Sequence, residues 1–225
     1  PRGMIGRRTA AAVLVVLTAA LSGCAHAIDG TATWPGARLE AAILTAADFP
    51  AGVQYVRVPE NPDQVDGEGG PPAMLSSPEG CTDGLTRVIA ASAERGAGSA
   101  AKYVVAYDGA RMVMTVVSWP LDLDGLAAVA QRCASFQTFF DRSSQGIPMT
   151  TTRLETSRPS ALAYQQTMQL GTQQNSVYFS FENVGPSAVF GIALPTPNPT
   201  IAVKATLPQT FMELVAKQAQ RFELR

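Results

Sequence analysis

The first 24 residues constrain this chain more than any other segment. Arg7 and Arg8 form a short basic region, and residues 9–21 form an uncharged, mainly apolar run. A membrane-spanning helix needs about 20 apolar residues, so this run is shorter than a span but has the length of a signal-peptide core. The sequence therefore predicts export across the cytoplasmic membrane, and the rest of the chain should fold in an oxidising compartment.

The apolar run ends in Leu-Ser-Gly-Cys at positions 21–24, which resembles the lipobox of bacterial lipoproteins. The resemblance implies that diacylglycerol is transferred to the Cys24 thiol, that the chain is cut after Gly23, and that the new amino terminus is acylated. Two alternatives stay open: an ordinary secretory signal with a coincidental cysteine, and an uncleaved membrane helix. Several acyl chains anchor a protein stably, whereas one chain binds a membrane only marginally. We expect residues 1–23 to be a signal peptide that is removed. Residues 24–38 should form a lipidated tether on the extracytoplasmic face of the cell membrane.

Removal of residues 1–23 changes the charge balance of the chain. The full sequence has 17 basic and 18 acidic side chains, and the removed segment contains three arginines and no acidic residue. The mature chain therefore keeps 14 basic and 18 acidic side chains, a net charge of −4. This balance argues against nucleic acid, and against an anionic bilayer, as the main partner.

Two further cysteines, Cys81 and Cys133, lie in the part of the chain expected outside the cytoplasm. Cysteines in an exported domain should pair, and a bridge closing a loop of about 53 residues contributes about 4 kcal/mol on the loop-entropy model. A metal site or a reactive thiol is the alternative. The sequence contains no Cys-x-x-Cys motif, and its single histidine, His26, lies two residues from Cys24. A zinc site would therefore lack its usual nitrogen and sulfur ligands.

Hydrophobic periodicity predicts a single α+β domain over residues 39–225, with helices packed on an antiparallel sheet and one disulfide between two helices. Both cysteines should lie on the inner faces of their helices. In chain order we expect a helical turn capped by Thr45 and stopped by Pro50, a strand at 53–58, a long loop at 59–80, a helix at 80–94, and a hairpin of strands 102–107 and 112–119 around Asp108-Gly109. The next helix should be capped by Asp122 or Asp124, and its apolar stripe should run through Cys133 and Phe136 to Phe140. A meander of strands at 150–155, 163–170, 177–183 and 188–194 should follow, and then a final helix at 211–222 that is entered through Pro208.

The sequence contains no recognisable catalytic arrangement. A Ser-His-Asp triad needs a base, and His26 lies on the tether; no Gly-x-Ser-x-Gly elbow is present, and a Ser-Lys pair that uses Lys102, Lys204 or Lys217 stays open as an alternative. Asp63, Asp66 and Glu68 do not have the spacing of a calcium loop, so we interpret them as a solvated acidic loop. We expect no enzymatic activity, no cofactor and no bound metal.

Aromatic and amide side chains are the remaining candidates for ligand contacts. The aromatic residues on expected strands should form a core on one face of the sheet and ordinary surface on the other, or else line a groove for an apolar or glycan ligand. Glutamines in the same region could bind sugars but are equally typical of an exposed strand. The aromatic residues are Tyr103, Tyr107, Trp119, Tyr164, Tyr178, Phe179 and Phe181, and the glutamines are Gln165, Gln166, Gln169, Gln173 and Gln174.

The lipobox, the Leu-Thr-Ala-Ala-Asp-Phe-Pro segment at 44–50, the helices of Cys81 and Cys133, and the closing helix resemble mycobacterial lipoproteins. The order of elements over about residues 40–225 is similar to the extracellular sensor domain of the mycobacterial serine/threonine kinase PknH. That domain has two disulfides, whereas this chain can form one. The resemblance implies a sensor-like domain that binds a small molecule, glycan or lipid at residues that the sequence does not identify. The alternatives are a protein-interaction module that assists a membrane complex and, with its base missing, a hydrolase.

Overall fold

The structure is a computed structural model that describes residues 35–59, 74–92, 96 and 98–224, and these described residues belong to one compact unit. Cys24, His26, Asp63, Asp66 and Glu68 lie outside the described residues. No helix among the described residues is both long enough and apolar enough to cross a membrane.

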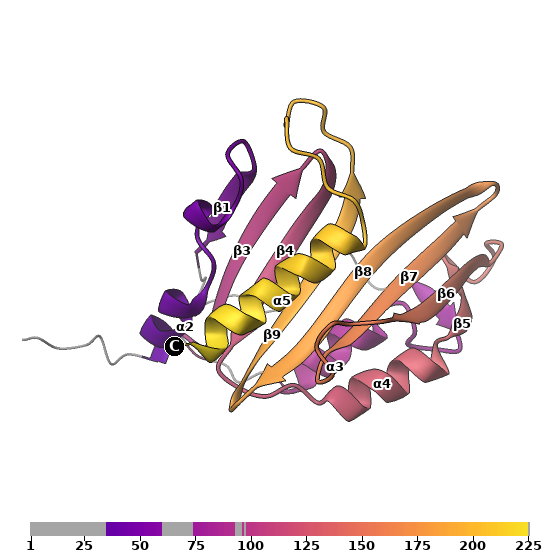
Figure 1. Ribbon diagram of the computed structural model, residues 1–225. Helices are drawn as coiled ribbons and strands as arrows, with labels where there is room; N and C mark the ends of the chain where they lie inside the picture. The colour runs from indigo at the N-terminus through magenta and orange to yellow at the C-terminus, as the bar shows by residue number, and fades with distance from the viewer. Residues whose placement is uncertain (1–34, 60–73, 93–95, 97, 225) are drawn as a thin grey trace, which may run out of the picture. The chain divides into compact units, whose positions relative to one another are not determined.

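The unit is built on one antiparallel sheet of nine strands, ordered β1-β3-β4-β9-β8-β7-β6-β5-β2 (Figure 1). The strands are β1 (Gln54–Val58), β2 (Leu75–Ser77), β3 (Ala100–Tyr107), β4 (Gly109–Val117), β5 (Ser135–Phe139), β6 (Ile147–Leu154), β7 (Leu162–Leu170), β8 (Gln173–Val184) and β9 (Ser187–Thr196). The helices are α2 (Pro35–Ala42), the 3-10 turn η1 (Ala46–Asp48), α3 (Gly84–Ser92), α4 (Leu123–Arg132) and α5 (Gln209–Glu223). The α+β class, the hairpin, the meander and the final helix after Pro208 are confirmed.

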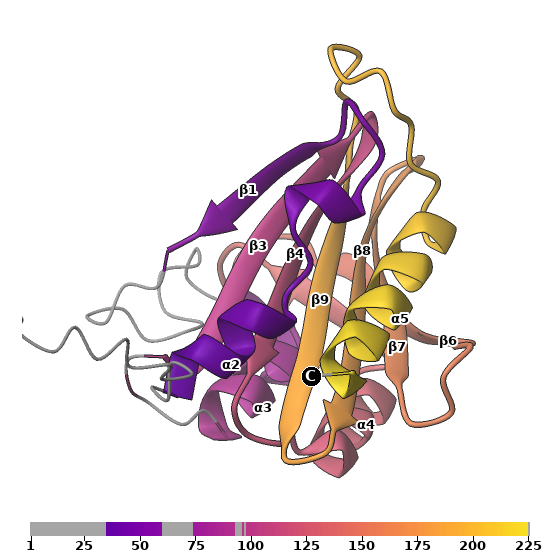
Figure 2. The same cartoon turned by 60° about the vertical axis from the view of Figure 1, so that its left-hand side comes forward.

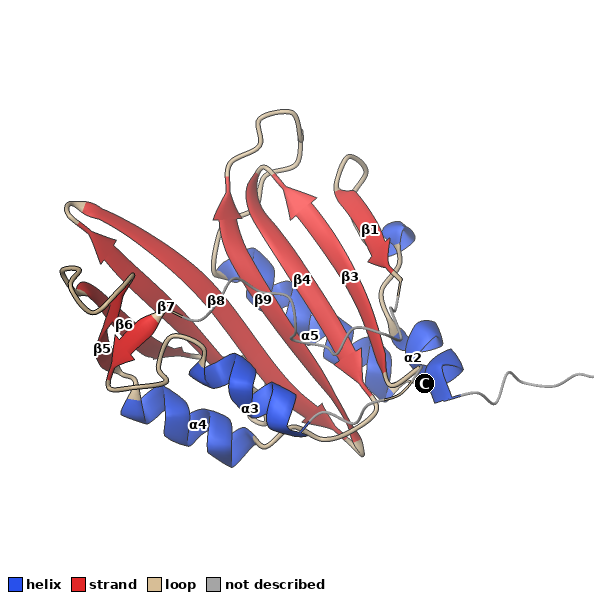
Figure 3. Cartoon of the chain, turned by 180° about the vertical axis from the view of Figure 1, so that it is seen from behind, coloured by secondary structure: helices blue, strands red, loops and turns tan. Residues whose placement is uncertain are grey.

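Helices cover both faces of the sheet. Helices α2 and α5 pack on one face (Figures 1 and 2), and α3 and α4 pack on the other (Figure 3). Neighbouring residues of a strand contribute to different cores because their side chains alternate between faces. Thus Tyr178 belongs to the α2–α5 core, whereas Phe179 and Phe181 belong to the α3–α4 core, with ring centroids 6.4 Å apart. This alternation is the one predicted from the sequence.

A buried amide joins the N-terminal segment to the last helix. Gln218 of α5 is fully buried, and its Oε1 accepts hydrogen bonds from the Leu44 amide and the Tyr103 hydroxyl, each at 3.0 Å. Its Nε2 donates to the Ala42 carbonyl at 2.9 Å. The same side chain therefore fixes α2 and the segment after it against both α5 and the sheet.

Capping groups set the ends of two helical elements as the sequence predicted. The Asp48 carboxylate accepts from the Thr45 amide at 2.8 Å, and the Thr45 carbonyl accepts from the Asp48 amide at 2.9 Å. Before α4, the Asp122 carboxylate accepts from the Gly125 amide at 2.8 Å. Such contacts satisfy amide groups that have no partner inside the helix.

Two boundaries near the start of the domain differ from the prediction. Helix α2 begins at Pro35, so residues 35–38 of the expected tether are helical. Proline is preorganised for the first helical position, and the buried Leu39 and Ala42 give α2 an apolar side that packs on the first core. The expected loop at 59–80 contains strand β2, which is only three residues long and too short to show a periodicity.

The prediction that the disulfide joins two helices was wrong in detail. Helix α3 begins at Gly84, three residues after Cys81, and Cys133 is the residue that caps the C-terminus of α4. Residues 135–139 form strand β5 instead of continuing the helix: Phe136 is buried on that strand, and Phe140 is 74% exposed beyond it. The spacing of Phe136 from Cys133 fits a helix, but the alternation of residues 135–139 fits a strand equally well, and the strand has partners on both sides.

Candidate functional site

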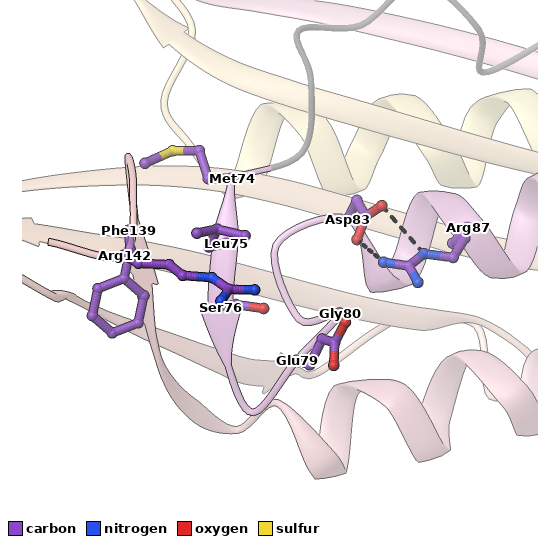
Figure 4. Close-up of a pocket in the computed structure, with 9 residues that line it drawn as sticks. All are labelled: Met74, Leu75, Ser76, Glu79, Gly80, Asp83, Arg87, Phe139 and Arg142. Carbon is purple, nitrogen blue, oxygen red and sulfur yellow. Dashed lines mark hydrogen bonds and ion pairs between the residues drawn. The ribbon is translucent and has the colours of Figure 1, made fainter. Parts of the chain in front are cut away.

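A cleft lies at the sheet edge formed by β2, between this strand and the start of α3 (Figure 4). Its volume is about 510 Å³, within the range typical of small-molecule sites. The lining residues come from β2, the segment leading to α3, α3 itself, and the end of β5 with the turn after it: Met74, Leu75, Ser76, Glu79, Gly80, Asp83, Arg87, Phe139 and Arg142.

The disulfide fixes one wall of this cleft. Cys81 and Cys133 are bonded, their Cα atoms are 5.5 Å apart, and both residues are buried with Phe136. This pairing confirms the predicted bridge. Because Cys81 immediately follows Gly80, the bond holds the segment before α3 against the C-terminus of α4.

Side-chain hydrogen bonds fix the same wall to strand β2. The Cys81 amide donates to Ser76 Oγ at 2.9 Å, and Thr82 Oγ1 donates to the Met74 carbonyl at 2.6 Å. From α4, Arg132 Nη1 donates to the Glu79 carbonyl at 2.9 Å. Thr138 Oγ1 of β5 donates to the Leu75 carbonyl at 3.1 Å. The cleft is therefore largely formed before any ligand arrives, which reduces the conformational entropy lost on binding.

The cleft contains one cation that is already neutralised. Arg87 of α3 forms an ion pair with Asp83, the residue immediately before the helix. The hydrogen bond from Arg87 to the Asp83 carboxylate, with the negative charges of Asp83 and Glu79, raises the pKa of the arginine above its ordinary value. Arg87 and Asp83 thus form a polar rim of the cleft. An exposed ion pair of this kind contributes little to the stability of the fold.

Arg142 is the cation of the cleft that has no hydrogen-bond or ion-pair partner among the described residues. Its side chain extends across β2 toward Ser76 (Figure 4). The neighbouring carboxylate of Asp141 accepts instead from the Ser143 hydroxyl at 2.6 Å and from the Ser143 and Ser144 amides. These hydrogen bonds lower the pKa of Asp141, so this carboxylate is stabilised by its own turn. The Arg142 guanidinium remains available to a ligand.

Apolar side chains stand beside this guanidinium. Leu75 is 45% exposed, and Met74 and Phe139 are half-buried in the cleft lining. An arginine fork binds carboxylate or phosphate by two parallel hydrogen bonds, while apolar side chains favour a hydrocarbon or ring. The arrangement suits a small amphipathic molecule with an acidic group.

The residues that the sequence singled out lie elsewhere. All seven aromatic candidates are buried in the two cores, so they form the interior and do not line a groove. Gln165 donates to Ser176 at 2.9 Å and Gln169 to the Gly171 carbonyl, which is the behaviour of ordinary strand and turn side chains. Lys102, Lys204 and Lys217 do not line the cleft. Within the described part of the chain, no group of three or more His, Cys, Asp or Glu residues could hold a metal ion.

Sequence reasoning did not identify the cleft residues, although one signal pointed to them. The predicted bridge at Cys81 restrains the residues next to it, but it does not specify the strand at Leu75–Ser77. Residues 135–139, which form β5, were expected to continue a helix. Because β2 pairs with β5, the position of β2 could not be predicted without that strand.

No protein-family model matches the chain, and no curated protein matches it. A solved structure of an uncharacterized protein from the mycobacterium Mycobacterium smegmatis is similar, with 13% sequence identity and a TM-score of 0.48. The match covers 84% of this chain and 95% of that chain. A likeness at this level does not bear on function.

Proposed function

We propose that this chain is a cell-envelope lipoprotein whose domain is a non-enzymatic, sensor-like module that binds a small amphipathic molecule. The observation that carries the proposal is the cleft at β2, which combines Arg142 with the apolar Met74, Leu75 and Phe139. Lipidation of Cys24 would hold this domain at the extracytoplasmic face of the membrane. A fixed wall beside the disulfide suits recognition, since binding then requires little rearrangement.

The ligand class follows from the two kinds of side chain in the cleft. A charged hydrogen bond to the guanidinium contributes about 1.5–3 kcal/mol, and burying an apolar group contributes about 25 cal/mol per Å². Neither kind of contact alone distinguishes a ligand from the many ions and apolar solutes of the envelope. A molecule that has both an acidic group and an apolar part would use the whole lining.

A protein-interaction module is the second candidate, and one observation favours it. Phe140 is 74% exposed directly after the cleft residue Phe139, and exposed aromatic side chains are enriched at protein interfaces. A protein partner would bury Phe140, whereas a small ligand confined to the cleft would leave it exposed.

Replacing Cys24 by alanine tests the anchor. We expect the variant to leave the membrane fraction, because the acyl chains would have no attachment site. Fractionation of cells followed by immunoblotting measures this. The matched control is His26→Ala, which changes a residue of the same tether outside the lipobox, breaks no bond in the domain, and should keep the protein on the membrane. Unchanged membrane retention of Cys24→Ala would argue against lipidation.

Native mass spectrometry tests the cleft. We expect the protein purified from its own host to carry a bound small molecule, and Arg142→Glu to weaken retention about tenfold or more, because a charged hydrogen bond is replaced by repulsion. Lys204→Glu makes the same change in net charge at an exposed residue outside the cleft and should retain the molecule. Equal retention by both variants would contradict a site at Arg142. Loss of a protein partner in Phe140→Ala, with no small molecule in the wild type, would support the interaction module.

A further inference from the structure

A second cavity lies at the loop that joins β6 to β7, two strands labelled in Figure 1. Its volume is about 450 Å³, near the small end of the range for small-molecule sites. None of its lining residues lines the cleft at β2, so the two cavities are separate. We call it the β6–β7 pocket and define it by its lining residues: Arg153, Leu154, Glu155, Thr156, Pro159 and Ala161.

A buried carboxylate fixes the loop that borders this pocket. Glu182 of β8 is 5% exposed, and it accepts hydrogen bonds from Arg158 Nε at 2.7 and 2.8 Å and from Ser160 Oγ at 2.8 Å. Within the loop, the Arg158 carbonyl accepts from Thr156 Oγ1 at 2.7 Å and from the Ala161 amide at 3.0 Å. Side chains and backbone thus hold the loop in one conformation, so little conformational entropy is lost when the pocket takes up a ligand.

Arg158 is neutralised by this arrangement and does not line the pocket. Its Nη2 also donates to the Glu223 carboxylate at the end of α5, so the guanidinium lies between two carboxylates. The hydrogen bond to Glu223, together with that to Glu182, raises the pKa of the arginine above its ordinary value. Arg158 therefore organises the loop and leaves ligand contacts to the charged residues that line the pocket.

The pocket is lined by two opposite charges, those of Arg153 and Glu155. Both residues are exposed, and neither side chain forms a hydrogen bond or an ion pair, with the other or with any further residue that the structure describes. Arg153 is paired with Tyr164 of β7. Burial raises the pKa of Tyr164 and the positive charge of Arg153 opposes this rise, so the tyrosine is neutral at neutral pH and does not compensate the guanidinium.

The two charges are close enough to contact one small molecule. Arg153 and Glu155 are two residues apart, so their Cα atoms are separated by at most about 7 Å. A guanidinium binds a carboxylate through two parallel hydrogen bonds, and a carboxylate accepts a charged hydrogen bond from an ammonium group. A simple anion or cation would satisfy only one of the two side chains. A zwitterion satisfies both and adds no net charge to the domain.

We propose that the β6–β7 pocket binds a free α-amino acid with a small apolar side chain. Arg153 binds the carboxylate of the amino acid and Glu155 binds its ammonium group. Its apolar side chain packs against Leu154, Pro159 and Ala161, the apolar part of the lining. An α-amino acid carries the two charged groups on one carbon atom, which matches the short separation of Arg153 and Glu155 along the chain.

The test uses NMR titration of the isotope-labelled mature chain with Cys24→Ser and the disulfide intact. L-Valine should shift the amides of residues 153–161. It should bind at least about tenfold more tightly than N-acetyl-L-valine, which lacks the ammonium group, or L-valinamide, which lacks the carboxylate. Arg153→Gln should weaken valine about tenfold and leave valinamide within about twofold, because valinamide has no carboxylate to lose. Glu155→Gln should weaken valine about tenfold and leave N-acetylvaline within about twofold.

Two control variants make the same changes of charge outside the pocket. Arg142→Gln changes the cleft arginine and Glu213→Gln changes an exposed residue of α5; both should bind valine within about twofold of wild type. Amide spectra that match wild type outside the loop show that each variant is folded. Unchanged amides at 153–161 in millimolar valine would overturn the proposal, and so would equal binding of valine and its two analogues. Loss of valine in Arg142→Gln alone would place the amino acid in the cleft and would also overturn it.

Discussion

Replacing Cys81 and Cys133 together by serine is expected to lower the free energy of unfolding by about 4 kcal/mol. The bond joins residues 52 positions apart, so its removal restores many conformations to the unfolded chain. Both cysteines are buried beside Phe136, so the two serine hydroxyls that replace them also lose contact with water. This desolvation lowers the free energy of unfolding further, but by less than the loss of the bond does. Urea unfolding of the oxidised protein at neutral pH measures the difference.

The single variants provide the control for this prediction. Cys81→Ser and Cys133→Ser should each cost about as much as the double variant, because either one abolishes the bond. Cys24→Ser should leave the free energy of unfolding within about 0.5 kcal/mol, since it breaks no bond in the domain. A double variant as stable as wild type would contradict the role assigned to the bond. Additive costs of the two single variants would show that packing of the two side chains, and not the bond, stabilises the domain.

Gln218→Leu is expected to lower the free energy of unfolding by about 3 kcal/mol, because each buried polar group that loses its partner costs about 1–3 kcal/mol. The change keeps the side-chain volume but leaves the Leu44 amide, the Ala42 carbonyl and the Tyr103 hydroxyl without their shared partner. Burial raises the pKa of Tyr103 far above its ordinary value, so its hydroxyl keeps the proton that it donates to Gln218 throughout the physiological range.

Gln220→Leu is the matched control on the same helix, because Gln220 is exposed and should tolerate the change within about 0.5 kcal/mol. Urea unfolding compares the two variants, and hydrogen exchange locates the loss. In Gln218→Leu, amides near Leu44 should exchange faster than those of the β7–β8 hairpin. Equal stability of the two variants would show that the buried amide does not fix the N-terminal segment.

Local signals were sufficient to predict most of the sheet. Asp108-Gly109 marked the β3–β4 hairpin, and the alternation of residues 177–183 separated Tyr178 from Phe179 as the two cores require. The cap at Asp122 followed from its short acceptor side chain, and the turn after Thr45 from the preference of threonine for the first position of a helical turn. In each case the residues that determine the local structure lie within a few positions of one another, so the preferences of single residues for turns, caps and strand faces were sufficient to predict it.

The candidate site could not be predicted in the same way. It depends on β2, a three-residue strand that pairs with β5 at the far edge from β1, and no local pattern specifies which strand lies beside another. Contacts between strands have the same origin, since Val56, Val113 and Ile192 are distant in sequence and form one row only through the register of four strands. The buried Gln218 illustrates the limit for polar residues, because its partners come from α2, β3 and the segment between α2 and β1.

Hydrogen exchange on the protein from its own host tests most directly whether the cleft beside β2 binds a small ligand. Exchange is measured by mass spectrometry before and after bound molecules are removed by unfolding and refolding with the disulfide intact. We expect removal to increase exchange in peptides covering residues 74–87 and 135–142, with little change in α5, because a ligand that binds only the folded cleft suppresses its opening. Exchange that is unchanged in both peptides, with or without changes elsewhere, would contradict a ligand site in this cleft.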